Sequence, residues 1–336
     1  MKKILFAIAA VALAVVSCDK NAPDTTVKDY SNVKVSLSVT MPDALTKANY
    51  SLSNPSNPIG GLTFTWAEDD KLTLIVFQGD NANWKNNCVY TEFNLPAAAE
   101  GTTHYDVSGL TTSLDLSGFD SNENLKYVIL FGGYFNDYWK IYSFHNGVPY
   151  IPYNSSISDQ ISAHDMIAET AVKEVPFPSG DLELSGSLHW ITSVLALQFD
   201  IDPAADVVYP NDYSLIFQLN RSSNFINMYE PVTRYADTVD GYMVMPINFT
   251  GDHKLSDALD ANNCRYFVIQ SDGMTSDYPS AKIAGSTFSV RNSNNTDYTA
   301  SGSVGGSVVI EAGKVYGMKI KVTDSDSDGV PEFAKL

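Results

Sequence analysis

The residue with the most specific chemistry in this sequence is a cysteine that follows an N-terminal apolar segment. Two lysines precede the apolar residues 4–16, and Cys18 comes directly after Ser17. The segment is shorter than the roughly 20 residues of a bilayer span and has the size of a secretory signal. A branched apolar residue at position −3 and a small residue at −1 resemble a bacterial lipobox. We expect residues 1–17 to be a lipoprotein signal peptide and Cys18 to carry diacylglycerol; the alternative is an ordinary signal peptide beside an incidental cysteine.

A second group of side chains with ligand chemistry lies near the end of the sequence. Three aspartates alternate with serines before a glycine, which is how a calcium-binding loop begins: Asp324, Asp326 and Asp328. The twelfth position of such a loop needs a glutamate but is Lys335 here, and Glu332 is the substitute. The sequence leaves two interpretations open, a calcium site or a solvated acidic tail over residues 324–336.

Aromatic residues beside asparagine and aspartate offer a third kind of chemistry. Aromatic rings can stack on sugar rings while neighbouring polar groups bind the hydroxyls. Tyr138 and Trp139 follow Asn136-Asp137, and Trp84 lies in an asparagine-rich segment. A hairpin with aromatic packing across its strands explains the first cluster as well. Contact with a surface glycan or a host protein through these residues is therefore one hypothesis among two.

Patterns of catalysis and of nucleic-acid binding are missing from the sequence. The five histidines form neither His-x-x-x-His nor His-Glu-x-x-His spacing, and there is no Gly-x-Ser-x-Gly motif or phosphate-binding loop. The 39 acidic residues exceed the 21 basic ones and give a formal charge of −18, which disfavours binding to a phosphate backbone. We expect a non-enzymatic protein without a nucleic-acid partner and, calcium aside, without a cofactor.

The elements that position these residues are predicted to be strands, because apolar residues recur with period two. The clearest case is residues 33–41, whose inward side chains would be Val33, Val35, Leu37, Val39 and Met41. Similar segments begin near residues 72, 195 and 316, and a short helix is predicted over 256–261. The fold class is all-β, with two tandem β-sandwiches. Prolines and a glycine at 176–180 suggest the boundary, giving a tether at 18–32 and domains at 33–175 and 181–323.

Two cysteines remain after the lipidation site, Cys88 and Cys264. An exported protein can form a disulfide, but nothing in the sequence brings these two residues together. We expect two free, buried thiols.

The order of several short motifs resembles the fimbrillin family, the subunits of lipoprotein-derived pili of Gram-negative anaerobes. Beyond the lipobox, the residues that carry this resemblance are Thr46-Lys47-Ala48, Phe64-Thr65-Trp66, Asp159-Gln160, Ala163-His164-Asp165-Met166-Ile167-Ala168, Leu188-His189-Trp190-Ile191-Thr192-Ser193-Val194-Leu195 and Glu311-Ala312-Gly313-Lys314-Val315-Tyr316. The motifs span almost the whole chain. The resemblance rests on the order of these motifs, and not on any one of them.

The resemblance implies two transthyretin-like sandwiches and a surface-exposed lipoprotein of the outer membrane, held by its lipid anchor and part of a fimbrium. It also implies assembly with other pilus subunits by strand exchange, after a protease cuts between Lys47 and Ala48 and the first strand leaves. A surface glycan-binding lipoprotein is the alternative function, and a permanent first strand is the alternative role for residues 33–41. The sequence departs from the family in having Lys47 where arginine is common and Asp69 where glycine is common. It also has a poor donor strand at its C-terminus, which suggests a subunit that accepts a strand and donates none.

Overall fold

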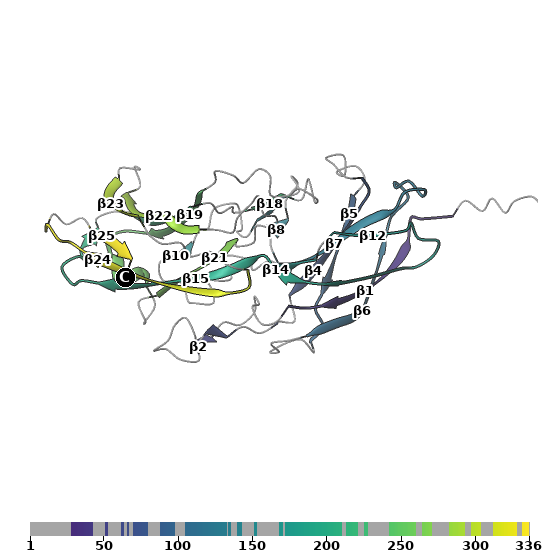
Figure 1. Ribbon diagram of the computed structural model, residues 1–336, viewed down its shortest axis with the longest axis horizontal. Helices are drawn as coiled ribbons and strands as arrows, with labels where there is room; N and C mark the ends of the chain where they lie inside the picture. The colour runs from purple at the N-terminus through teal and green to yellow at the C-terminus, as the bar shows by residue number, and fades with distance from the viewer. Residues whose placement is uncertain are drawn as a thin grey trace, which may run out of the picture.

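The computed structural model is built almost entirely of strands (Figure 1). It describes residues 28–42, 51–52, 62–63, 66, 70–79, 88–97, 105–132, 134–135, 140–142, 151–152, 168–170, 172–209, 213–220, 225–227, 242–259, 264–270, 282–292, 297–303, 312–327 and 331–335. The 3₁₀ turn η4 (Leu255–Ala258) lies where the sequence predicts a short helix. None of the described helical residues forms a helix long and apolar enough to cross a membrane. The all-β fold class is confirmed.

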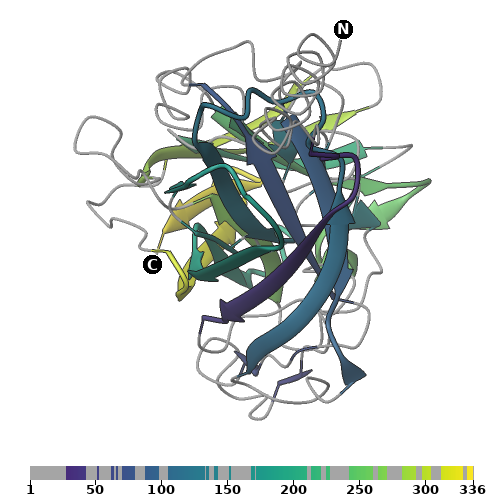
Figure 2. The same cartoon turned by 90° about the vertical axis from the view of Figure 1, so that its right-hand side faces the viewer.

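The first strand is the interior strand of a three-stranded sheet. Strand β1 (Val33–Thr40) pairs with β6 (Asp106–Leu114) in antiparallel register and with β13 (Leu182–Ser187) in parallel register. Its side chains alternate between buried and more exposed positions, as period two predicts. Figure 2 shows β1 in purple at the near side of the molecule with β6 beside it.

A six-stranded sheet packs against the buried face of β1 and completes a sandwich. Its main path runs through β14 (His189–Trp190), β11 (Ala168–Glu169), β7 (Leu125–Phe131), β4 (Lys71–Phe77) and β5 (Cys88–Asn94), and β12 (Lys173–Val175) also pairs with β7. One face of β4 and β7 joins the same core cluster as β1. The other face forms a second cluster with Ile191, so residues 127–131 of β7 are buried on both faces of the sheet.

The second half of the chain supplies most strands of two further sheets. A four-stranded sheet has the order β21 (Cys264–Gln270), β15 (Thr192–Ile201), β24 (Val315–Thr323) and β25 (Glu332–Lys335). A five-stranded sheet has the order β10 (Ile151–Pro152), β19 (Tyr242–Phe249), β17 (Tyr213–Asn220), β22 (Lys282–Asn292) and β23 (Asp297–Ser303). In Figure 1 these strands extend away from the end of the molecule that holds β1 and β6.

Short ladders complete the described strands. They are β2 (Ser51–Leu52) with β3 (Leu62–Thr63), β16 (Val208–Tyr209) with β20 (His253–Lys254), and β18 (Phe225–Asn227) with β9 (Lys140–Tyr142) and β8 (Tyr134–Phe135).

The domains expected at 33–175 and 181–323 stay a prediction, and two strand pairings connect segments on either side of the expected boundary. Strand β13 follows the proline-rich segment yet lies beside β1, and β10 lies in the five-stranded sheet of the second half. The prolines at 176 and 178 cannot donate ladder hydrogen bonds and so interrupt the strand. The chain then crosses over within the first sandwich, and sheet membership changes between β14 and β15.

The acidic segment after Thr323 is also more ordered than expected from its composition. Strand β25 pairs with β24 in antiparallel register, and the Phe333 side chain is buried between the exposed residues Glu332 and Ala334. The Glu332 carboxylate accepts hydrogen bonds from the backbone N–H and the hydroxyl of Ser325. Residues 324–336 therefore include a loop and an edge strand, not only a solvated tail.

Candidate functional site

The candidate functional site is the groove between β6 and β13 that β1 fills. The side chains of Val35 and Leu37 have no exposed surface, and Val33, Val39 and Met41 are at most 6% exposed. Both edges of β1 are used in ladders, to β6 on one side and β13 on the other. The strand thus contributes a full row of apolar side chains to the core and closes a gap between two other strands.

The residues just before β1 pack on the body of the protein instead of forming a free tether. The Asp29 carboxylate accepts a hydrogen bond from the Ser31 N–H at 2.9 Å, which shapes a turn. Hydrogen bonding to the Ser31 side chain, and then to its backbone, lowers the pKa of Asp29. The Tyr30 ring meets Phe177 edge to face, with ring centroids 4.9 Å apart. The Leu116 N–H donates to the Tyr30 carbonyl at 2.8 Å. The tether expected over residues 18–32 therefore ends in an ordered segment from residue 28 onward.

A bulge in β6 fixes the register of β1. Leu37 faces Leu110, whereas Val39 faces Val107, so two positions of β1 correspond to three of β6. Gly109 lies in the bulge with φ of 72°, a conformation that glycine adopts without steric penalty. Sliding β1 by one residue would turn its apolar side chains toward solvent.

The outer edge of β13 is closed by side chains. The Tyr127 hydroxyl donates to the Ser185 carbonyl at 2.8 Å and accepts from the Ser185 N–H at 3.4 Å. Lys173 Nζ donates to the same carbonyl at 2.9 Å. Burial raises the pKa of the Tyr127 hydroxyl above its usual value of 10, so the neutral, donating form is favoured. These contacts protect an edge strand from adding a foreign strand at that position.

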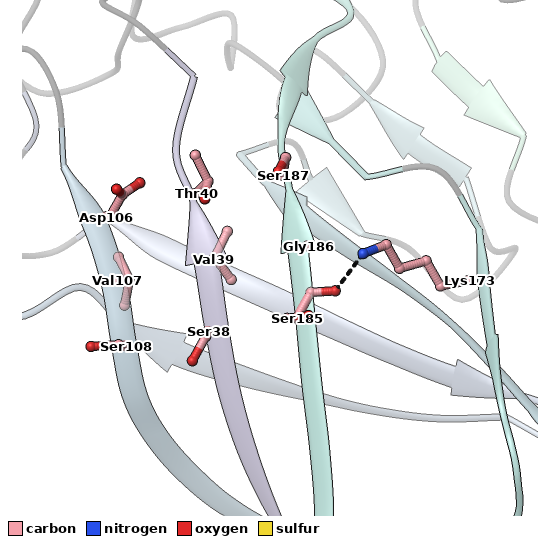
Figure 3. A pocket seen from close by; sticks show the side chains of 10 residues that line it. All are labelled: Ser38, Val39, Thr40, Asp106, Val107, Ser108, Lys173, Ser185, Gly186 and Ser187. Atoms are coloured by element: carbon pink, nitrogen blue, oxygen red, sulfur yellow. Dashed lines mark hydrogen bonds between the residues drawn. The ribbon is translucent and has the colours of Figure 1, made fainter.

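A shallow hollow of about 310 Å³ lies over the C-terminal end of β1 (Figure 3). Hydroxyl side chains from three strands line it, together with one carboxylate and one amine: Ser38, Thr40, Ser108, Ser185, Ser187, Asp106 and Lys173. The lining contains neither histidine nor cysteine.

Several of the motif residues meet where the two halves of the chain join. Trp66 stacks on Trp190 at 6.4 Å between ring centroids, and Phe131 packs edge-on against both rings. Ala168 is the ladder partner of both Trp190 and Phe131. Gly313, with φ of 70°, lies so close to Trp190 that an added Cβ would be 2.9 Å from Cδ1 of its ring. The spacing of these motifs in the sequence thus reflects one packed junction.

Most of the predicted chemical residues lie outside the described part of the chain. These are Cys18, Lys47, Ala48, Trp84, Asp328, Tyr138 and Trp139. Lipidation, cleavage and glycan contact at these residues stay predictions. Asp324 and Asp326 are described, and no group of three or more potential metal ligands occurs among the described residues; calcium binding with Asp328 stays a prediction too.

The two remaining cysteines are free, as expected. Cys264 is fully buried and Cys88 is partly so. Burial raises the pKa of the Cys88 thiol well above its usual value, so the reactive thiolate is scarce at neutral pH.

Several residues that position β1 and β13 were not predicted from the sequence. Tyr30 carried a signal, an aromatic residue just before a strictly alternating segment. Tyr127, Phe177 and Gly186 carried none, because their partners Ser185, Tyr30 and Thr170 belong to other segments of the chain.

The chain is thus an all-β protein of packed sheets whose first strand is an interior one. No model of a known protein family matches the sequence, and no curated protein matches it. Among solved structures, it is similar to a putative cell adhesion protein from Parabacteroides distasonis, with 12% identity over 90% of this chain and 92% of that one and a TM-score of 0.42.

Two further solved structures are similar over nearly their full length. A putative cell adhesion protein from Bacteroides ovatus has 10% identity over 91% of this chain and 96% of that one, with a TM-score of 0.40. The tip fimbrial protein Mfa3 from Porphyromonas gingivalis, with C-terminal truncation, has 10% identity over 91% of this chain and 98% of that one, with a TM-score of 0.38.

Proposed function

We propose that this chain is a fimbrillin-like pilus subunit or adhesin, exported as an outer-membrane lipoprotein, that assembles by β-strand complementation. In this proposal a protease cuts after Lys47, β1 leaves with the lipidated N-terminus, and a strand of another subunit takes its place. The observation that supports the proposal is the position of β1, an interior strand formed by the first described segment of the chain.

The order of β1 in the chain makes its removal simple. An interior strand from the middle of a sequence has connections at both ends and needs two cuts before it can leave. Strand β1 precedes every other described strand, so a single cut in the segment that follows it would release it. Lys47 lies five residues beyond Pro42, where the described segment ends, and a cut there would leave β6 and β13 attached to the body.

Removal of β1 would leave a groove that favours the binding of another strand. Five buried apolar side chains would leave the core, and each is worth roughly 1.5–3 kcal/mol of burial. The backbone groups of β6 and β13 that now bond to β1 would lose their partners as well. A groove with apolar pockets and two unsatisfied strand edges is a template for β-augmentation.

The C-terminal strand is the less suitable donor in this proposal. Strand β25 already pairs with β24, and its Phe333 is buried. Its departure would leave the β24 edge open, and the acidic loop before it is tied to Glu332 through Ser325. We therefore propose an accessory or tip role, in which the subunit accepts a strand and donates none.

Mass spectrometry of the protein from the cell surface tests this proposal. Polymer-associated chains should begin at Ala48, whereas chains still in the membrane should begin at a lipidated Cys18. A Lys47→Ala variant should accumulate in the lipidated form, and Lys47→Arg should be cut like the wild type. Recovery of only lipidated, uncut chains from surface polymers would contradict the proposal.

A further inference from the structure

The contact between Tyr30 and Phe177 has features that the rest of the β1 site lacks. The pockets under β1 accept aliphatic side chains at alternate positions, and any alternating apolar strand can fill such pockets. Tyr30 lies outside this row, three residues before the first inward side chain, Val33. Its ring meets Phe177 edge to face at 4.9 Å between centroids, so the entrance of the groove has an aromatic partner of defined geometry.

The backbone around Tyr30 fixes where that ring can lie. The Leu116 N–H binds the Tyr30 carbonyl at 2.8 Å, and the Asp29 side chain shapes the turn that follows. Lys28 Nζ donates to the Ser179 carbonyl at 3.2 Å, beside Phe177 in the chain. The segment before β1 therefore contacts the rest of the protein at Leu116, Phe177 and Ser179. The last two residues lie on the crossover between β12 and β13.

The crossover belongs to the body and would stay behind when β1 leaves. Phe177 is only partly buried with Tyr30 in place, and it packs against the main core. Without Tyr30 one edge of its ring loses an aromatic neighbour, while the bulge at Gly109 still sets the register of whatever strand enters. A strand in that register places its third residue before the first inward position against Phe177.

We propose that Phe177 and the Ser179 carbonyl form a selectivity slot that favours incoming strands with an aromatic residue three positions before their first inward apolar residue. The inference rests on the proposed function, since it specifies the partner of the same groove. The partner is a segment of another subunit with apolar residues at four or five alternate positions, preceded by the aromatic residue. A basic residue two positions before the aromatic one would repeat the contact of Lys28 with Ser179.

Strand exchange in the cut chain tests the slot. A version of the chain that starts at Asp19, without the lipidation site Cys18, and carries a specific protease site around residue 47 is folded whole and then cut. Fluorescent peptides of residues 28–42 compete for the groove in three versions: unchanged, Tyr30→Ala and Tyr30→Phe. A Lys34→Ala peptide is the matched control, because Lys34 points outward and is exposed. Occupancy is measured by anisotropy after the cut strand is displaced.

The unchanged and Tyr30→Phe peptides should occupy the groove alike, and the Tyr30→Ala peptide about tenfold less, as expected for loss of an edge-to-face pair. In a Phe177→Ala chain this difference should vanish, which a general loss of stability would not cause. Equal occupancy by the unchanged and Tyr30→Ala peptides in the wild-type chain would overturn the slot and leave strand exchange intact. A cut strand that no peptide displaces would overturn strand exchange, and the slot with it.

Discussion

At the scale of single residues, two glycines lie close to the side chains of other strands. Gly313 lies against Trp190, where the two halves of the chain join. Gly186 of β13 lies against Thr170 and Ile129, within the first sandwich. Neither was predicted in detail: the motifs around residues 190 and 313 were noted for their order, but their contact follows from packing that no local pattern encodes.

The first prediction concerns Gly313, whose substitution combines two penalties. Gly313→Ala puts a side chain at φ of 70° and drives its Cβ to 2.9 Å from Trp190. Gly251→Ala is the matched control, because Gly251 has φ of 79° and nothing within 4 Å of its added Cβ. We expect Gly251→Ala to lower the free energy of unfolding by about 1 kcal/mol. Gly313→Ala should lower it by about 1–3 kcal/mol more.

Denaturant unfolding followed by tryptophan fluorescence measures both variants. Trp190 and Trp66 stack on each other at this junction, so the emission of the folded Gly313→Ala chain should change as well. Equal losses of stability in the two variants would mean that the approach to Trp190 contributes nothing.

The second prediction concerns Gly186 on β13. An added Cβ would lie 2.5 Å from Thr170 Cγ2 and 3.0 Å from Ile129 Cδ1. Thr170 cannot rotate away freely, because its hydroxyl accepts from the Ile129 N–H at 3.0 Å and its own N–H binds the Ile129 carbonyl. Gly186→Ala should lower the free energy of unfolding by about 1–3 kcal/mol. Gly118→Ala, in an exposed position with open space, should change it little; a neutral Gly186→Ala would contradict the close packing of the two sheets.

At the scale of elements, the positions of several strands can be predicted from the sequence, whereas the pairing of these strands with one another cannot. Period two in Val33, Val35 and Leu37 predicts β1 and its buried face, and the structure confirms both. The parallel pairing of β1 with β13 joins segments about 150 residues apart, so no local signal announces it. Strand β25 was missed because its polar residues and the acidic loop before it conceal one buried residue, Phe333.

The third prediction concerns the link between β7 and β13. Burial raises the pKa of Tyr127 in the folded chain, so the unfolded chain ionises first as the pH rises through about 10. The contribution of Tyr127 to stability is therefore complete below pH 10 and is lost as the pH approaches its folded pKa. Tyr127→Phe should cost about 1 kcal/mol at pH 7 and make the alkaline loss of stability shallower.

Chemical denaturation between pH 7 and 11 provides the measurement. Tyr90, which is 54% exposed, supplies the control: Tyr90→Phe should change the stability at pH 7 little. An alkaline slope in Tyr127→Phe equal to that of the wild type would show that the Tyr127 hydroxyl is not held in its neutral form.

At the scale of the whole molecule, one core extends from β1 to β21. The same cluster of buried residues contains Val35 and Leu37 of the first sheet and Tyr266 and Val268 of the second half. Strands from either side of the proline-containing segment 176–180 pair in the same sheets. Composition and period two were sufficient to predict an all-β fold. The division into contiguous domains could not be predicted from them, because it depends on which distant strands pair.

The central claim is that β1 leaves this core during assembly. A reversible disulfide between β1 and β6 tests that claim most directly. Lys34 of β1 and Ser113 of β6 are exposed ladder partners, so a Lys34→Cys/Ser113→Cys chain can tie β1 to its neighbour through a disulfide. The measurement is the fraction of the chain that enters surface polymers, with the two single variants as controls. The oxidised double variant should stay out of polymers and enter them on reduction; entry of the oxidised chain at the wild-type level would contradict the departure of β1.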